Sequence, residues 1–334
     1  MRAGTARWGT ARHIFGLTVR ISVTALLLVW LFRHAGGFRP VLNAILAARP
    51  DLIAAAFFTT LLVQAAVAHR LRLLAGTQGV QLGTREVMEI NLVTLFYSLF
   101  LPGGGITAIM IRFYRLTRSD RRYAATLAAI VCDRLLATAT MCVVGLTFWL
   151  LDGPSRSQPA LIVLLAASAT AALALSPMFN SAPAELISRL ASRLPVVRGL
   201  WPRIAEALAV FRAIPRRGQL GIAALSLAAQ VLGVAVYYLL ARAIGVGTSF
   251  VALGWMRSTA TLVAILPFSV SGLGLREGTM VQLLGGRGVP GNAALAYSLL
   301  VFGVTILSVG LLGGLIEVVR WLRPRRETPA DTRR

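Results

Sequence analysis

The fold is decided by the stretch LPFSVSGLGLREG, residues 266–278, which breaks a long hydrophobic segment with a proline and several glycines. An earlier hydrophobic segment breaks in the same way at LPGGG, residues 101–105, and the two prolines are 165 residues apart. An arginine follows each break: Arg112 lies ten residues past the first proline, and Arg276 lies nine past the second. Interrupted hydrophobic segments at matching positions in two halves of a chain are typical of the binding site of a membrane transporter.

The composition indicates a membrane protein with many spanning segments. Of the 334 residues, 57% are hydrophobic and 14% are charged, and the mean hydropathy is +0.74. These values exclude a disordered chain and an ordinary soluble domain. All 34 basic residues are arginines, and the formal net charge is +22. A nucleic-acid-binding face does not normally coexist with long apolar runs. We therefore expect no nucleic acid partner, and we attribute the arginines to topology, to anionic lipid headgroups and to genome composition.

Six apolar runs are long enough to cross a bilayer as helices, which needs about 20 residues each. They cover roughly residues 16–32, 52–68, 124–151, 160–177, 219–241 and 294–316. Two further runs, 87–115 and 250–285, contain the breaks. The predicted fold class is therefore an all-α polytopic membrane protein with six full spans and two broken, re-entrant segments.

Arginine placement predicts the orientation of this fold. Arginines are dense at the N-terminus, in 112–122, in 178–218 and after Arg320, and arginine-rich loops stay in the cytoplasm. If the N-terminus is inside and each broken segment returns to its own side, all these stretches and the C-terminus are cytoplasmic. The first broken segment then enters from the cytoplasm and the second from the outer face. The topology therefore predicts two inverted repeats.

The predicted repeats cover residues 50–151 and 219–320 of a single membrane domain. Gln64 and Gln230 lie 38 and 37 residues before the proline of their repeat, each within the preceding helix. The connector at 178–218 contains leucines on one helical face and arginines on the other. This pattern favours an amphipathic helix in the inner headgroup layer, with a solvated connector as the alternative.

Two pairs of adjacent opposite charges lie within the predicted membrane interior, Asp133 beside Arg134 and Arg276 beside Glu277. A charge at bilayer depth costs about 2.5–3.5 kcal/mol even on a lenient insertion scale. Neighbours in sequence do not face each other on a helix, so each member needs another partner, water or an anionic substrate. Either these residues line a hydrated cavity, or they pair across the two repeats as a structural latch.

The glycines in both breaks permit backbone conformations closed to other residues and expose N–H groups. At the mouth of a half-helix such groups favour an anion, and arginine presents a planar fork that matches phosphate oxygens. The alternative is that the glycines only form the turns. The candidate substrate-binding residues are Gly103, Gly104, Arg112, Asp133, Arg134, Gly272, Gly274, Arg276 and Glu277.

No catalytic or cofactor pattern accompanies the breaks. The sequence contains no Gly-Lys-Ser/Thr of a phosphate-binding loop, no His-Glu-x-x-His and no Gly-x-Ser-x-Gly. Its three histidines and two cysteines form no metal-ligand spacing. We therefore expect no cofactor, no metal and no enzymatic activity.

The second break resembles the signature of the lysylphosphatidylglycerol synthase transmembrane family, which is also described as flippase-like. The first break, with RFYRL at 112–116, is similar to that family's Pro-Gly-Gly…Arg element, and Asp133-Arg134-Leu135 stands where members carry Glu-Arg-Leu. The likeness covers residues 10–322. Two features depart from the family: ITAI at 106–109 lacks the acid that precedes the arginine, and the arginine is shifted by one.

The resemblance implies an inner-membrane protein that translocates or handles an anionic lipid or a lipid-linked headgroup, with membrane lipids as partners. We expect no aminoacyl-transferase domain after the last helix and therefore no synthase activity. One alternative is a non-transporting scaffold whose arginine-rich inner surface recruits an enzyme of lipid or envelope-glycan modification. Another is a membrane transferase acting on a lipid-linked sugar.

Overall fold

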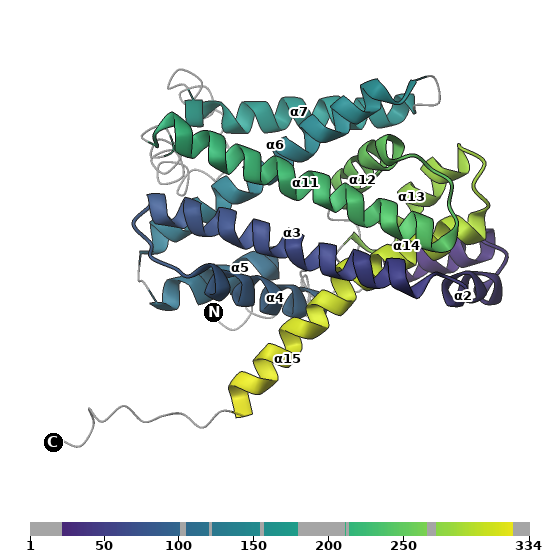
Figure 1. Ribbon diagram of the computed structural model, residues 1–334, viewed down its shortest axis with the longest axis horizontal. Helices are drawn as coiled ribbons and strands as arrows, with labels where there is room; N and C mark the ends of the chain where they lie inside the picture. Colours follow the sequence, from purple (N-terminus) through teal and green to yellow (C-terminus); the bar gives the residue numbers. More distant parts are fainter. Residues whose placement is uncertain are drawn as a thin grey trace, which may run out of the picture.

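The computed structural model describes residues 22–100, 105–119, 122–153, 157–179, 211, 214–265 and 272–322. Regular structure in these residues is helical throughout, with no strand (Figure 1). Five helices are long and apolar enough to cross a bilayer: Pro50–Thr77, Ala125–Leu151, Gln158–Ser176, Arg216–Ile244 and Gly291–Leu322. The predicted first span, 16–32, begins outside the described residues, and its described part belongs to a shorter apolar helix, Ser22–His34. The all-α membrane fold is confirmed for the described residues, with five of the six predicted spans.

The two halves of the chain contain the same order of helices. After Ser22–His34 and α2 (Phe38–Leu46), the first half forms α3 (Pro50–Thr77), α4 (Thr84–Phe100), α5 (Gly105–Ser119), α6 (Tyr123–Leu151) and α7 (Gln158–Phe179). The second half forms α11 (Arg216–Ile244), α12 (Phe250–Ala264), α13 (Leu275–Gly285), α14 (Gly291–Phe302), a π-helix (Gly303–Leu307) and α15 (Ser308–Leu322). In each half, a long helix is followed by two short helices and then by another long apolar segment. Each short pair, α4 with α5 and α12 with α13, contains one of the predicted breaks.

The ends of the long helices follow local sequence signals. Pro50 begins α3 and Pro215 immediately precedes α11, both positions at which proline's missing N–H leaves no helical hydrogen bond unmade. Gly245 ends α11 in the left-handed conformation, with φ 82°. Ser249 then caps α12, because its hydroxyl accepts a hydrogen bond from the N–H of Ala252 at 3.2 Å.

The long helices α3 and α11 lie side by side and antiparallel at the centre of the molecule (Figure 1). The N–H of Arg49, just before α3, donates to the carbonyl of Ala243 near the end of α11 at 3.0 Å. Helices α4 and α12 therefore begin at opposite ends of this central pair. Gly79, after α3, lies directly beside the Arg122 side chain, before α6. The chain thus enters and leaves the α4/α5 pair at the same end.

One helix of each short pair packs against the other half of the chain. Helix α4 packs along α15, and α12 packs along α6. A Cβ added at Gly313 of α15 would overlap the carbonyl oxygen of Leu92 on α4, and one added at Gly254 of α12 would overlap the Phe148 ring on α6. Small residues let membrane helices approach closely. In these two interfaces the helices of the two halves therefore approach so closely that only glycine fits at the point of contact.

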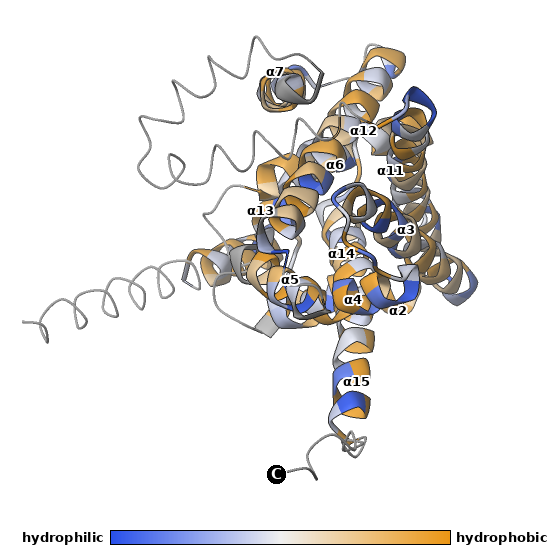
Figure 2. Cartoon of the chain, turned by 90° about the vertical axis from the view of Figure 1, so that its left-hand side faces the viewer, coloured by the Kyte–Doolittle hydropathy of each residue, from blue (hydrophilic) through white to orange (hydrophobic). Residues whose placement is uncertain are grey.

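The outer faces of the long helices are apolar. Many large hydrophobic side chains are exposed along them, including Leu62, Leu151, Leu165, Leu220 and Leu315. Figure 2 shows this as hydrophobic colouring along α3 and α11. Such a surface suits contact with lipid. The predicted connector at 178–218 lies mostly outside the described residues, so its amphipathic helix remains a prediction.

Candidate functional site

Asp133 lies at the centre of a buried charge cluster in the first half of the chain. Its side chain, on α6, is 1% exposed, and its Oδ1 accepts a hydrogen bond from Nε of Arg70 on α3 at 2.8 Å. Nη2 of Arg70 also lies 2.8 Å from the same oxygen, within ion-pair distance. Arg70 is itself 2% exposed. The carboxylate thus joins two long helices at a depth where neither charge can reach water, and each ion depends on the other.

Arg112 completes this cluster from the first broken segment. Its Nη1 lies 3.8 Å from Oδ2 of Asp133, and its side chain is 9% exposed. That separation is too long for a hydrogen bond, and Oδ2 has no hydrogen-bond partner among the described residues. Arg134 also lies 4.0 Å from Oδ2, but its side chain is 53% exposed. The structure therefore brings Arg112 and Asp133 together, whereas Arg134 points largely outward.

The second break contains an ion pair between sequence neighbours. Nη2 of Arg276 lies 2.5 Å from Oε1 of Glu277, which is fully buried. The expectation that adjacent residues would need other partners is wrong here, because Glu277 stands in the first turn of α13 and folds back toward its start. Its Oε2 accepts a hydrogen bond from the N–H of Gly274 at 2.7 Å. This arrangement is a capping interaction that satisfies a backbone donor at the helix N-terminus.

The glycines of the second break have backbone conformations that require glycine. Gly272 has φ 77° and Gly274 has φ 89°, values that side-chain-bearing residues rarely adopt. A Cβ at Gly272 would lie 2.7 Å from Cβ of Ala264, and one at Gly274 would lie 3.0 Å from Cβ of Leu27. The N–H of Gly274 is used by Glu277, so it is not free for an external anion. Gly103 and Gly104 lie outside the described residues.

The sequence patterns missed a further arginine, Arg257 of α12. Its Nη1 donates to Oε1 of Gln230 on α11 at 2.9 Å, and its guanidinium lies 5.7 Å from the centre of the Tyr237 ring. Gln230 in turn donates from Nε2 to the carbonyl of Ala137 on α6 at 2.9 Å. Arg70 was also missed, because the predicted span ended at residue 68 whereas α3 continues to Thr77.

The alternative interpretation, a latch of these charged residues across the two repeats, is not what the structure shows. Asp133 pairs with arginines of the first half, and Glu277 pairs within the second. Interior arginines therefore outnumber their acids: Arg70 and Arg112 share Asp133, Arg276 uses Glu277, and no acid pairs with Arg257 among the described residues. The interior of the described helices carries excess positive charge.

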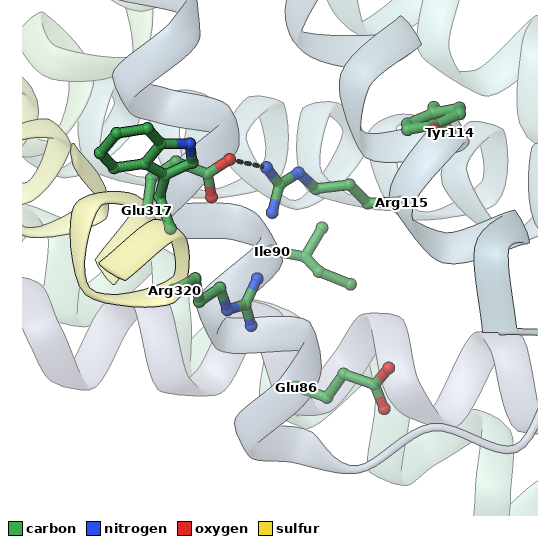
Figure 3. A pocket seen from close by; sticks show the side chains of 7 residues that line it. Glu86, Ile90, Tyr114, Arg115, Glu317 and Arg320 are labelled. Carbon is green, nitrogen blue, oxygen red and sulfur yellow. Dashed lines mark hydrogen bonds and ion pairs between the residues drawn. The ribbon is translucent and has the colours of Figure 1, made fainter. Parts of the chain in front are cut away.

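Ion pairs between the halves occur instead at the ends of the bundle. Arg115 of α5 pairs with Glu317 of α15 at 2.5 Å, Arg320 pairs with Glu89, and Arg287 pairs with Asp152. The first two of these border a cavity of about 460 Å³. Figure 3 shows Glu317 and Arg115 facing each other there, with Ile90, Arg320 and Glu86 beside them. None of the predicted site residues lines this cavity.

The fold and the buried charges define a multi-pass α-helical membrane protein with an ionised interior. The model of the family described as the lysylphosphatidylglycerol synthase TM region matches residues 17–313, so the chain belongs to that family, a group of membrane proteins related to lipid handling. Comparison with curated proteins gave no match.

Proposed function

We propose that this protein moves an anionic lipid, or a lipid-linked headgroup, between the two leaflets of a bacterial inner membrane. One observation supports this most strongly: the interior arginines exceed the acids available to neutralise them. An ionised side chain at bilayer depth is costly and generally marks a substrate or ion path. An anionic headgroup would supply the missing negative charge.

Arg112 is the residue we expect to contact the headgroup first. Its nearest acid is already bonded to Arg70 through the other carboxylate oxygen, so most of its five N–H donors remain available. Those donors form a planar fork that fits two phosphate oxygens at once. Arg112 also belongs to α5, the segment that follows the first break, where a transporter would combine substrate contact with movement.

Unsatisfied polar groups near the same helices are consistent with a wet interior. The side-chain amide of Asn91 and the hydroxyl of Thr94, both on α4, are buried and have no hydrogen-bond partner among the described residues. Buried polar groups in proteins are nearly always paired with protein or water. Water or a headgroup moving along this route would satisfy them.

The arrangement of the helices supports a two-repeat mechanism. Helices α3 and α11 are antiparallel, the short pairs begin at opposite ends of them, and α4–α15 contacts correspond to α12–α6 contacts. Two inverted repeats around a central site would let the protein open first to one leaflet and then to the other. With both termini in the cytoplasm, the cavity beside Glu317 and Arg320 would face the inner leaflet.

The test is translocation of a fluorescent phosphatidylglycerol in proteoliposomes, read by dithionite quenching of the outer leaflet. Arg112→Gln should slow translocation by about tenfold or more, because a hydrogen bond to a charged group contributes about 1.5–3 kcal/mol. The matched control is Arg242→Gln, since Arg242 is exposed at the end of α11. Thermal unfolding of each variant checks that the fold is retained.

Three outcomes would contradict the proposal. Wild-type vesicles could match protein-free vesicles, Arg112→Gln could transport like wild type, or a zwitterionic phosphatidylcholine probe could cross as fast as the anionic one. The first of these, combined with recovery of a lipid-modifying enzyme on the same protein, would instead favour the scaffold alternative.

A further inference from the structure

The guanidinium of Arg257, on α12, lies against three residues of α11. Gln230, Gly233 and Tyr237 lie at positions i, i+3 and i+7 of α11, so they form one stripe facing α12. Gln230 accepts a hydrogen bond from Arg257, and the Tyr237 ring lies 5.7 Å from the guanidinium carbon. A Cβ at Gly233 would lie 2.5 Å from Nη2 of Arg257. The glycine therefore makes room for the guanidinium.

Gln230 and Tyr237, which contact the Arg257 guanidinium, are themselves held by further hydrogen bonds. Nε2 of Gln230 donates to the Ala137 carbonyl on α6 at 2.9 Å, which turns the amide oxygen toward Arg257. The hydroxyl of Tyr297 on α14 donates to the carbonyl of Tyr237 at 3.1 Å, and the two rings meet edge to face. The guanidinium is thus held in one place by four helices before any ligand arrives.

The charge of Arg257 has no matching acid. None of the ion pairs among the described residues involves it, and Glu277, the buried acid of the second half, is already bonded to Arg276 and to Gly274. One hydrogen bond to Gln230 uses one of the five N–H donors of the guanidinium. A neutral side chain could make that same bond to Gln230 without the cost of a charge in the membrane interior. The structure gives this charge no neutralising partner among the described residues, and Arg257 is partly rather than fully buried.

We propose that Arg257, with Gln230, Gly233 and Tyr237, forms a second anion-binding site, one that takes the phosphate group of a membrane lipid. This inference rests on the proposed function. It adds a second binding site for the lipid headgroup, in the second half of the chain. The site differs from the Asp133 cluster, because its arginine is held by neutral groups rather than by a carboxylate. An arriving phosphate would bind the remaining guanidinium donors bidentately.

Binding by the full-length protein in detergent tests this site separately from transport. Isothermal titration would use three probes: short-chain phosphatidylglycerol, short-chain phosphatidylcholine and inorganic phosphate. Arg257→Gln should weaken the phosphatidylglycerol affinity by about tenfold or more, the loss expected for a charge-assisted contact. Arg257→Lys should restore part of it, since lysine keeps the charge but lacks the fork. Arg242→Gln is the matched exposed control and should bind like wild type.

Each result decides the inference. Stronger binding of phosphatidylglycerol than of inorganic phosphate assigns a lipid headgroup, and equal binding assigns free phosphate at the same site. If Arg257→Gln does not fold, Gln230→Ala should still weaken binding several-fold, because it releases the guanidinium from its place. Wild-type affinity in Arg257→Gln, or in Gln230→Ala when the first variant is unfolded, overturns the inference. If Arg112→Gln still slows translocation in that case, the proposed function stands without this site.

Discussion

The two halves of the chain pair their buried charges in different ways. In the first half, Asp133 on α6 holds Arg70 on α3 at 2.8 Å and draws Arg112 on α5 to within 3.8 Å, so one acid joins three helices. In the second half, Glu277 pairs with its own neighbour Arg276 and caps its own helix. The first cluster joins residues that are far apart in the sequence, whereas the second joins residues of one helix start. Loss of the acid should therefore disturb the two halves to different extents.

The largest effect should follow removal of the shared acid. Asp133→Asn preserves the side-chain size but leaves Arg70 buried without its ion partner, with Arg112 beside it. Breaking a buried pair by removing one partner costs about 3–5 kcal/mol. Unfolding in detergent, followed by denaturant or temperature, should show a loss of stability in that range. A variant within about 0.5 kcal/mol of wild type, the usual scatter for surface substitutions, would mean that the cluster does not hold the helices together.

A smaller loss is expected for the local acid of the second half. Glu277→Gln retains an oxygen that can accept from the Gly274 N–H but removes the charge paired with Arg276. Arg276 is 12% exposed and lies over the Phe302 ring, so it keeps part of its environment. We expect a destabilisation of about 1.5–3 kcal/mol, the contribution of a charged hydrogen bond. If Glu277→Gln lost as much stability as Asp133→Asn in the same measurement, the two halves would not differ in the way described.

The sequence predicted the all-helical membrane fold and the placement of Asp133 and Glu277 in its interior, whereas it assigned Arg112 to a cytoplasmic arginine-rich stretch and the structure buries that residue. These features follow from local patterns, such as the length of apolar runs and the scarcity of acids. The partner of Asp133 could not be found this way, because Arg70 lies 63 residues earlier and only helix packing brings the two together.

Other errors had signals that went unused. The hydrogen bond from the Gly274 N–H to the Glu277 carboxylate follows from the position of Glu277 three residues after Gly274, at the start of a helix, which is capping-box spacing. The distance of Gln230 from the proline of its repeat singled out α11. The role of Gln230, however, depends on Arg257, which lies inside an apolar run with no motif around it. The excess of interior arginines over interior acids depends on which residues pair in space, and the sequence does not show those pairs.

A double-mutant cycle should separate the two arginines that share Asp133. Arg70 makes a hydrogen bond and a close ion-pair contact to the carboxylate, both at 2.8 Å, whereas Arg112 makes no hydrogen bond to it. The coupling energy between Arg70→Gln and Asp133→Asn should be about 1.5 kcal/mol or more, and that between Arg112→Gln and Asp133→Asn less than about 1 kcal/mol. Equal couplings would mean that Arg112 is an ordinary structural partner and not a residue available to a ligand.

The smallest effect concerns the turn of the second break. Gly274→Ala forces a side chain into a left-handed conformation at φ 89° and against Leu27, for a cost of about 1–2 kcal/mol. Gly76→Ala in α3 is the control, since a Cβ there meets no other group within 4 Å and alanine favours helix. Equal stability of the two variants would show that the turn at Gly274 is not under the constraint described.

The most direct test of the central claim is the translocation rate of the anionic probe in the double variant Arg112→Gln/Arg257→Gln. If the interior excess of positive charge moves the headgroup, this variant should transport no faster than protein-free vesicles, while Arg242→Gln keeps the wild-type rate and the double variant remains folded. A folded double variant that moves phosphatidylglycerol at the wild-type rate would contradict the account.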